Sequence, residues 1–136
     1  MTFSLDTNVM IDIVNRQKPQ VRARFDEALN SGTQIVTCAV AAHELVYGAM
    51  ISARPEVHVK RANELLGDLQ IVDWAYEDAH HTAVIRQSLR QQGLTIGAWD
   101  SLIAGQALHR GWTMVSHNLH EFTRIEGLEV VDWTAA

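Results

Sequence analysis

Short apolar runs rich in β-branched residues alternate along this chain with longer segments of helical periodicity. The runs predicted as strands are residues 2–5, 34–40, 71–74 and 112–116, with 130–133 as a further strand at an edge. The run 34–40 is apolar almost throughout, which is typical of a strand buried on both faces of a parallel sheet. The alternation predicts a three-layer α/β/α fold around a mainly parallel sheet of four to five strands.

The helical segments between these runs have recognisable ends. Thr7 or Asn8 is expected to cap the first helix, Pro19 and Pro55 suit the first turns of two others, and Gly93 follows a helix over 76–92. A helix from about residue 41 to 51 is predicted directly after the second strand.

One domain is expected over residues 1–136, because no linker or repeat interrupts the chain and 47% of its residues are hydrophobic. No apolar run is long enough to cross a bilayer, and the N-terminus lacks the pattern of a signal peptide. A cytoplasmic protein without membrane contact is therefore expected. Cys38 is the only cysteine, so a metal site would use oxygen ligands rather than thiolates.

The net charge of −5 argues against a protein that holds nucleic acid by broad neutralisation of phosphates. It remains compatible with a nuclease whose acidic site binds hard cations that then face the phosphate.

Carboxylates and one amide follow the predicted strands at their carboxyl ends, where ligands collect in parallel sheets. Asp6 follows the first strand, Glu44 the second, and Asn118 and Glu121 the fourth. Taken singly, each residue can be explained without a functional role, as a helix cap, an exposed helix position or a loop charge. Together they place three or four oxygen donors at one end of one sheet, which favours a magnesium or manganese site.

Asp100 belongs to the same set. Residues 96–108 predict a buried helix that begins near Ala98, with Gly97 at its entry and Asp100 in its first turn. A carboxylate there is favoured by the helix dipole alone. Its large apolar neighbours, Trp99 and Leu102, nevertheless make an unpaired charge costly to bury, which favours a cation partner.

Four motifs occur in a fixed order, and a Gly-Leu pair and an Asp-Trp pair follow them. They are Leu-Asp-Thr-Asn-Val at 5–9, His-Glu-Leu-Val-Tyr-Gly-Ala at 43–49, Ile-Gly-Ala-Trp-Asp at 96–100 with Leu-Ile-Ala at 102–104, and Val-Ser-His-Asn-Leu-His-Glu-Phe at 115–122. In this order and spacing the sequence resembles PIN-domain ribonucleases of the VapC toxin type over nearly its whole length.

The resemblance implies a magnesium- or manganese-dependent endoribonuclease that is the toxin of a type II toxin–antitoxin pair. It also implies a homodimer, neutralised by a VapB-like antitoxin in a higher assembly. The metal-binding and catalytic acids of the family fall on Asp6, Glu44 and Asp100. Glu121 is assigned to the fourth position, because Asn118 stands where many PIN domains carry Asp.

The ligand types suggest a mechanism. Asp6 and Asp100 would hold a first cation directly, and Glu44 and Glu121 would bind it through water or help to hold a second. The metal would activate a water for in-line attack on an RNA phosphodiester. Residues expected to position the substrate or a water lie beside these acids: Thr7, Asn8, Ser116 and Asn118.

Other residues keep two interpretations. Trp99 suits base stacking or core packing, and Arg86, Arg90 and Arg110 provide local positive surface for RNA or are simply solvated. Asp12 and Asp78 are interpreted as surface or cap acids, and His117 as an ordinary loop residue or a substrate contact. Two other functions remain open, a catalytically silent binding module and a phosphatase of small substrates.

Overall fold

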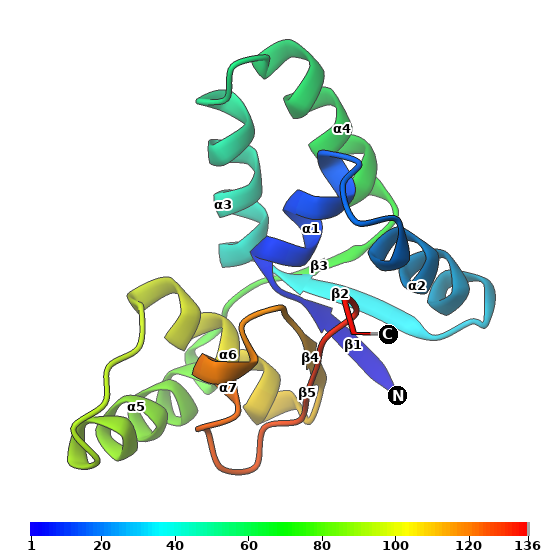
Figure 1. The fold of residues 1–136 in the computed structure, drawn as a ribbon. Coiled ribbons are helices and arrows are strands. Elements are labelled where there is room, and N and C mark those ends of the chain that lie inside the picture. Colours follow the sequence, from blue (N-terminus) through cyan, green and yellow to red (C-terminus); the bar gives the residue numbers. More distant parts are fainter. Residues whose placement is uncertain (136) are drawn as a thin grey trace.

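Five parallel strands form one sheet in the order β3-β2-β1-β4-β5 in the computed structural model, which describes residues 1–135 (Figure 1). The strands are β1 (Thr2–Leu5), β2 (Gln34–Cys38), β3 (Gln70–Val72), β4 (Thr113–Val115) and β5 (Val130–Val131). Central β1 pairs with β2 on one side and β4 on the other, so that Ser4 lies opposite both Val36 and Met114. The predicted α/β fold is confirmed, and all of its strand pairs are parallel.

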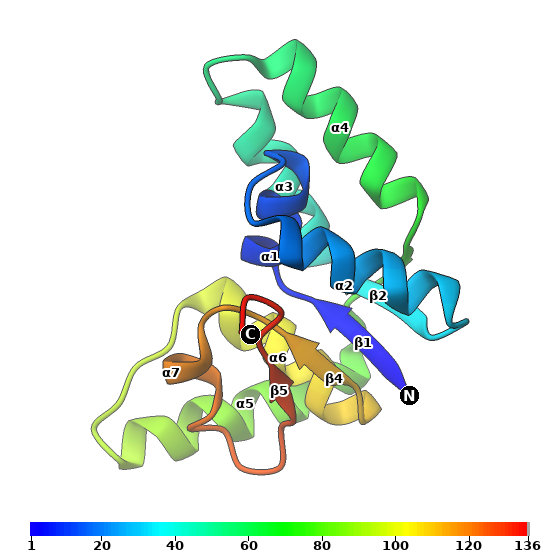
Figure 2. The same cartoon turned by 45° about the vertical axis from the view of Figure 1, so that its right-hand side comes forward.

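Seven helices surround this sheet within the described residues. They are α1 (Thr7–Val14), α2 (Pro19–Asn30), α3 (Ala39–Met50), α4 (Pro55–Gly67), α5 (Tyr76–Gln91), α6 (Ala98–Arg110) and α7 (Leu119–Phe122). Figures 1 and 2 show α2 on one side of the sheet and α5 with α6 on the other, whereas α3 and α4 extend beyond its carboxyl edge. Across residues 1–135, no helix combines the length and apolar character that crossing a membrane would need.

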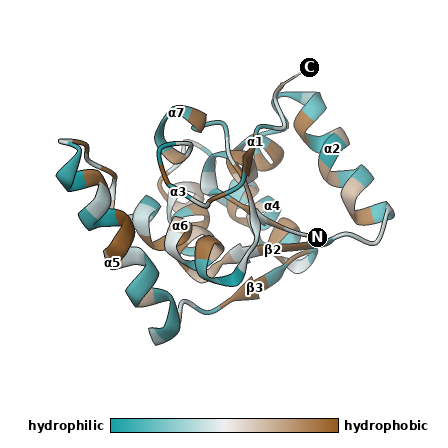
Figure 3. Ribbon diagram, turned by 90° about the horizontal axis from the view of Figure 1, so that it is seen from below, coloured by the Kyte–Doolittle hydropathy of each residue, from teal (hydrophilic) through white to brown (hydrophobic). Residues whose placement is uncertain are grey.

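The core lies between these layers. Its largest fully buried side chains include Phe25 from α2, Leu5 from β1 and Phe122 from α7. Trp133 is 3% exposed and meets Phe3 edge to face, with ring centroids 5.5 Å apart. Figure 3 shows mainly hydrophobic strands, with hydrophobic and hydrophilic residues alternating along α2 and α5, as expected for helices that cover a sheet.

Several predicted strands end one or two residues too late: β3 ends at Val72, β4 at Val115 and β5 at Val131, against predicted ends at 74, 116 and 133. Residues 34–40 were expected to form one strand, but β2 ends at Cys38 and α3 begins at Ala39, two residues earlier than predicted. An apolar run that passes from a buried strand into a buried helix contains no periodicity that marks the change. Thr7 or Asn8 was expected to cap α1. The cap is instead Asp6, for which a capping role was the alternative to metal binding, and its side chain accepts a hydrogen bond from the Thr7 amide.

A buried ion pair joins α5 to α6. Asp78 caps α5 by accepting from the Ala75 amide at 2.9 Å, and it also pairs with Arg110 of α6 at 3.3 Å. Burial alone would raise the pKa of Asp78, but the hydrogen bonds from Arg110 and Ala75 hold it below its usual value. Of the two interpretations of Asp78, the helix cap is confirmed and the surface position is wrong, because Asp78 is fully buried. Arg110 is paired with Asp78, so it is neither free for RNA nor simply solvated.

The two helices also approach closely at Gly105. A β-carbon added there would lie 1.9 Å from Thr82 Oγ1 and 2.9 Å from the Thr82 backbone. Gly105 therefore sets the distance between α5 and α6, and through it the position of the helix that carries Asp100.

Gly105→Ala is expected to lower the free energy of unfolding by about 1–3 kcal/mol, because the added methyl group overpacks the α5–α6 contact. Gly48→Ala in α3 is the matched control, since nothing lies within 4 Å of the added β-carbon. This control is expected to be neutral or to stabilise by up to about 1 kcal/mol through helix propensity. Urea unfolding measures both, and equal stabilities for the two variants would contradict the close contact at Gly105.

Candidate active site

Asp6 lies at the carboxyl end of β1 and is 3% exposed. Its Oδ1 accepts from the Thr7 amide at 2.8 Å, and its Oδ2 accepts from Ser116 Oγ at 2.9 Å and Asn8 Nδ2 at 3.2 Å. Burial raises the pKa of Asp6, and the nearby Glu44 adds to this, while the hydrogen bonds from Ser116 and Thr7 oppose it. The carboxylate is therefore held in one orientation by β4 and α1 together.

Ser116 and Asn8 connect Asp6 to the segment after β4. Ser116 is fully buried, and its hydroxyl oxygen also accepts from the Asn118 amide at 3.0 Å. Asn8 Oδ1 accepts from the His117 amide at 3.2 Å. Segment 116–118 is thus attached to the start of α1 by side chains from both segments.

Glu44 projects from α3 toward the same place. The Thr7 hydroxyl donates to Glu44 Oε1 at 2.9 Å, which links the first turn of α1 to α3. Glu44 is close enough to raise the pKa of both Asp6 and Asp100 by charge repulsion. The structure therefore places Glu44 within electrostatic reach of both Asp6 and Asp100.

Asp100 is half-buried in the first turn of α6, whose N-cap is Gly97 as predicted. Burial, followed by repulsion from Asp6, Glu121 and Glu44, raises the pKa of Asp100 to about 6. A β-carbon on Gly97 would lie 3.0 Å from Asp100 Oδ2, so glycine leaves room for this carboxylate. The three other acids contribute to one negative potential centred near Asp100.

Glu121 and Asn118 lie together at the fourth position. Asn118 Nδ2 donates to Glu121 Oε2 at 2.8 Å, and Arg124 approaches Glu121 Oε1 at 3.8 Å. The charge of Glu121 helps to raise the pKa of Asp100. The side chain of Asn118 is exposed to solvent. Both residues expected for this position are therefore present, with Asn118 orienting Glu121.

The donor set suits a hard divalent cation. Carboxylate oxygens are the ligands that magnesium and manganese prefer, and a cation would relieve the repulsion that raises the pKa of Asp100. In the side-chain positions seen over residues 1–135, no three carboxylate, imidazole or thiol groups converge closely enough to hold one ion. To bind one cation, the acids would need small rotamer changes or bridging waters. Magnesium commonly keeps several waters in its protein sites.

An imidazole between two carboxylates was missed by the sequence interpretation. His117 Nε2 contacts Asp12 Oδ2 in α1, and its Nδ1 lies 3.3 Å from Asp132 Oδ1 near the C-terminus. Asp12 is 7% exposed, so its interpretation as a surface or cap acid was wrong. Lys18 also reaches Asp12 at 3.3 Å. Nothing in the sequence indicates the contact between Asp12 and His117, which lie 105 residues apart in the chain.

Trp99, beside Asp100, is not packed in the core. Its side chain is 51% exposed and meets the His43 ring edge to face, with centroids 5.3 Å apart. Two interpretations were open for Trp99, base stacking and core packing. Its exposure excludes core packing and is compatible with base stacking.

The chain belongs to a known class of protein, the PIN domain, because the family model described as "PIN domain" matches residues 4–128. The chain is 35% identical to the tRNA(fMet)-specific endonuclease VapC of Salmonella typhimurium, over 98% of both chains. It is also 35% identical to Ribonuclease VapC2 of Haemophilus influenzae over the same shares. The chain belongs to the VapC family of PIN-domain ribonuclease toxins.

Solved structures agree with this assignment. The toxin fold in the VapBC2 complex of Rickettsia felis bound to a promoter DNA fragment matches with a TM-score of 0.90 and 28% identity, over 98% of this chain and 99% of that one. A chain of the DNA-bound VapBC complex from Salmonella typhimurium matches with a TM-score of 0.88 and 34% identity, over 98% of both. The protein is thus a VapC endoribonuclease.

Asp100→Asn is expected to raise the thermal unfolding midpoint of the metal-free protein at neutral pH. Folding raises the pKa of Asp100 from 3.8 to about 6, so the folded state binds its proton more tightly and loses stability as the pH rises through that interval. The midpoints of the variant and the natural protein, measured in a chelator, should therefore differ most above pH 6 and least below pH 3.8.

Asp78→Asn provides the control of opposite sign. The pKa of Asp78 is lowered, so its carboxylate stabilises the fold above pH 3.8, and the variant should lose stability at neutral pH. A fall in the neutral-pH midpoint for both variants would show that Asp100 is not under electrostatic strain.

Proposed function

We propose that the endoribonuclease activity resides in the acidic set Asp6, Glu44, Asp100 and Glu121 and depends on magnesium or manganese. The observation that carries this proposal is the approach of the four acids: Thr7 bonds to both Asp6 and Glu44, and Asp6, Glu44 and Glu121 all lie close enough to Asp100 to raise its pKa. These side chains come from four separate segments of the chain, after β1, in α3, in α6 and in α7. Asp6 and Asp100 would hold the cation, with Glu44 and Glu121 reaching it through water or helping to hold a second.

A bound cation would supply a water of lowered pKa for attack on the phosphodiester and would offset charge on the phosphate. The protein's own residues fix the geometry around it. Ser116 and Asn8 hold the Asp6 carboxylate, and Thr7 holds Glu44. Asn118, which is exposed and bonded to Glu121, is the member of this set best placed to orient a water or the substrate.

We infer that the substrate is a transfer RNA. The relatives from Salmonella typhimurium and Shigella flexneri, 35% and 36% identical, are described as tRNA(fMet)-specific endonucleases. Initiator tRNA is accordingly the first RNA to test, with elongator methionine tRNA as the comparison, and the activity would take place in the cytoplasm. A phosphatase of small substrates is tested in parallel with p-nitrophenyl phosphate, which this proposal expects to remain intact.

Asp6→Asn, Glu44→Gln and Asp100→Asn should each reduce RNA cleavage in magnesium by more than about 100-fold, the upper limit usual for groups that only support ligands. Glu121→Gln should lose less, about 10- to 100-fold. Asp26→Asn, which removes one negative charge from an exposed pair with Arg22, is the matched control and should retain activity. Gel-based cleavage assays measure these rates, with circular dichroism to confirm folding. Full activity of Asp100→Asn would refute the proposed site.

We propose further that the chain forms a homodimer and pairs with a VapB-like antitoxin in a higher assembly. Related structures are described as VapBC complexes bound to DNA. An apolar groove of about 150 Å³ lies between α1, α3 and α4 beside Glu44, lined by residues that include Ile11, Val14 and Ala49. On α1 the exposed apolar side chain is Ile11, which is 39% exposed, whereas Val9 is fully buried.

A silencing antitoxin segment is expected to insert an arginine among Asp6, Glu44 and Asp100, since its planar fork can engage two carboxylates. Apolar residues of the same segment would fill the groove at Ile11. Replacing that arginine with alanine should restore RNA cleavage and metal binding while the complex persists, as calorimetry and cleavage assays would show. A complex that stays intact and equally silent would mean that inhibition covers the RNA path instead.

A further inference from the structure

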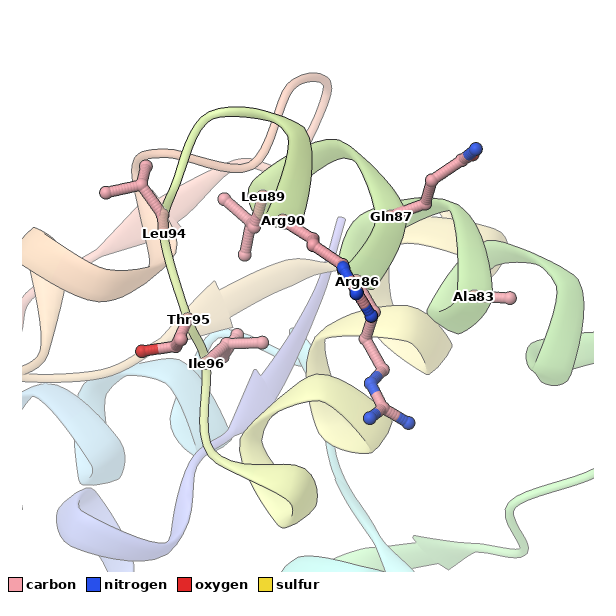
Figure 4. A pocket seen from close by; sticks show the side chains of 8 residues that line it. All are labelled: Ala83, Arg86, Gln87, Leu89, Arg90, Leu94, Thr95 and Ile96. Carbon is pink, nitrogen blue, oxygen red and sulfur yellow. The ribbon is translucent and has the colours of Figure 1, made fainter.

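An open groove of about 670 Å³ separates the C-terminal half of α5 from the segment that leads into α6. Figure 4 shows its two walls, with Arg86 and Arg90 on the helix and Leu94, Thr95 and Ile96 on the facing segment. Both arginines are exposed, whereas Leu89 between them is buried and forms the floor. No carboxylate lines the groove among the described residues.

The groove is lined by two cations and by no anion among the described residues. The protein has a net charge of −5, and cations such as Lys18, Arg110 and Arg124 are paired with carboxylates. Within residues 1–135, neither Arg86 nor Arg90 makes an ion pair or a side-chain hydrogen bond. Two guanidinium groups four residues apart on a helix repel each other, and an anion between them would relieve that repulsion.

The groove also lies next to the acidic set. Its wall at Thr95 and Ile96 continues directly into Gly97, the N-cap of the helix that carries Asp100. Arg124 donates to the Thr95 carbonyl at 2.9 Å and also contacts Glu121, so the wall is attached to the fourth acid as well. A strand of RNA whose phosphate lies at Asp100 would therefore pass this groove.

We propose that the groove holds the RNA backbone beside the scissile bond, with Arg86 and Arg90 binding successive phosphates. Leu94 and Ile96 give the ribose an apolar surface, and exposed Trp99 lies on the neighbouring first turn of α6, where a base can stack. This inference rests on the proposed ribonuclease function, since it names where the substrate of the same site is held. Guanidinium groups suit the task because they bind phosphate through two donors at once.

The test is the double variant Arg86→Gln with Arg90→Gln. Its binding to fluorescein-labelled initiator tRNA is measured by anisotropy over a range of salt concentrations, in an Asp100→Asn background that prevents cleavage. The salt slope of the binding constant should fall by about 0.7 for each lost phosphate contact. In the otherwise natural protein, the double variant should raise the KM for tRNA several-fold and leave kcat nearly unchanged.

The matched control is Arg54→Gln with Lys60→Gln, which removes the same charge from α4, far from α5 in Figure 1. An unchanged salt slope in the groove variant, or an equal fall in both variants, would overturn the inference. Light scattering gives a further check, because a dimer lost only in the groove variant would make this surface a contact between copies of the chain and overturn RNA binding there.

Failure of this inference is distinguishable from failure of the proposed function. If Asp6→Asn and Glu44→Gln abolish cleavage while the groove variant binds RNA normally, only the groove assignment is wrong. If those acid variants cleave normally, the proposed site is wrong whatever the groove does.

Discussion

Burying a carboxylate at the end of the central strand is the constraint on which the site depends. Asp6 is 3% exposed, and an ionised group so buried is costly unless its oxygens accept hydrogen bonds. The Thr7 amide, the Ser116 hydroxyl and the Asn8 amide meet that requirement, and they come from α1 and from the end of β4. The hydrogen bonds that offset the cost of burying the Asp6 carboxylate therefore also fix the two segments that surround it.

The sheet order explains why the other acids arrive at the same point. β1 lies between β2 and β4, so the segments after these three parallel strands all leave from one edge. Glu44 follows β2, and Glu121 follows β4. Asp100 arrives by a different route, in the first turn of α6, whose position depends on its close contact with α5 at Gly105. Helix packing thus sets one acid of the site and sheet pairing sets the rest.

The sequence predicts most of the fold and the four acids, because alternating periodicities and the ends of strands are local patterns. It does not predict contacts between distant polar residues. The pairing of His117 with Asp12, and of Arg110 with Asp78, depends on how helices pack, and neither charge pattern nor spacing indicates it. The start of α3 was missed for a related reason, because apolar residues continue unchanged from β2 into the helix. The exposure of Trp99 likewise follows from the turn into α6, which composition does not reveal.

An acidic ribonuclease has to attract a polyanion to a set of carboxylates. A cation held by Asp6 and Asp100 would reverse the charge only locally, since screening limits its reach to about 8–10 Å at physiological salt. Beyond that distance, attraction has to come from the protein's own cations, of which Lys18, Arg110 and Arg124 are already paired with carboxylates. Arg86 and Arg90 lie beside the acidic set without carboxylate neighbours in their groove. A division of charge between the proposed metal-binding acids and an adjacent arginine groove would therefore account for RNA binding by a protein whose net charge is negative.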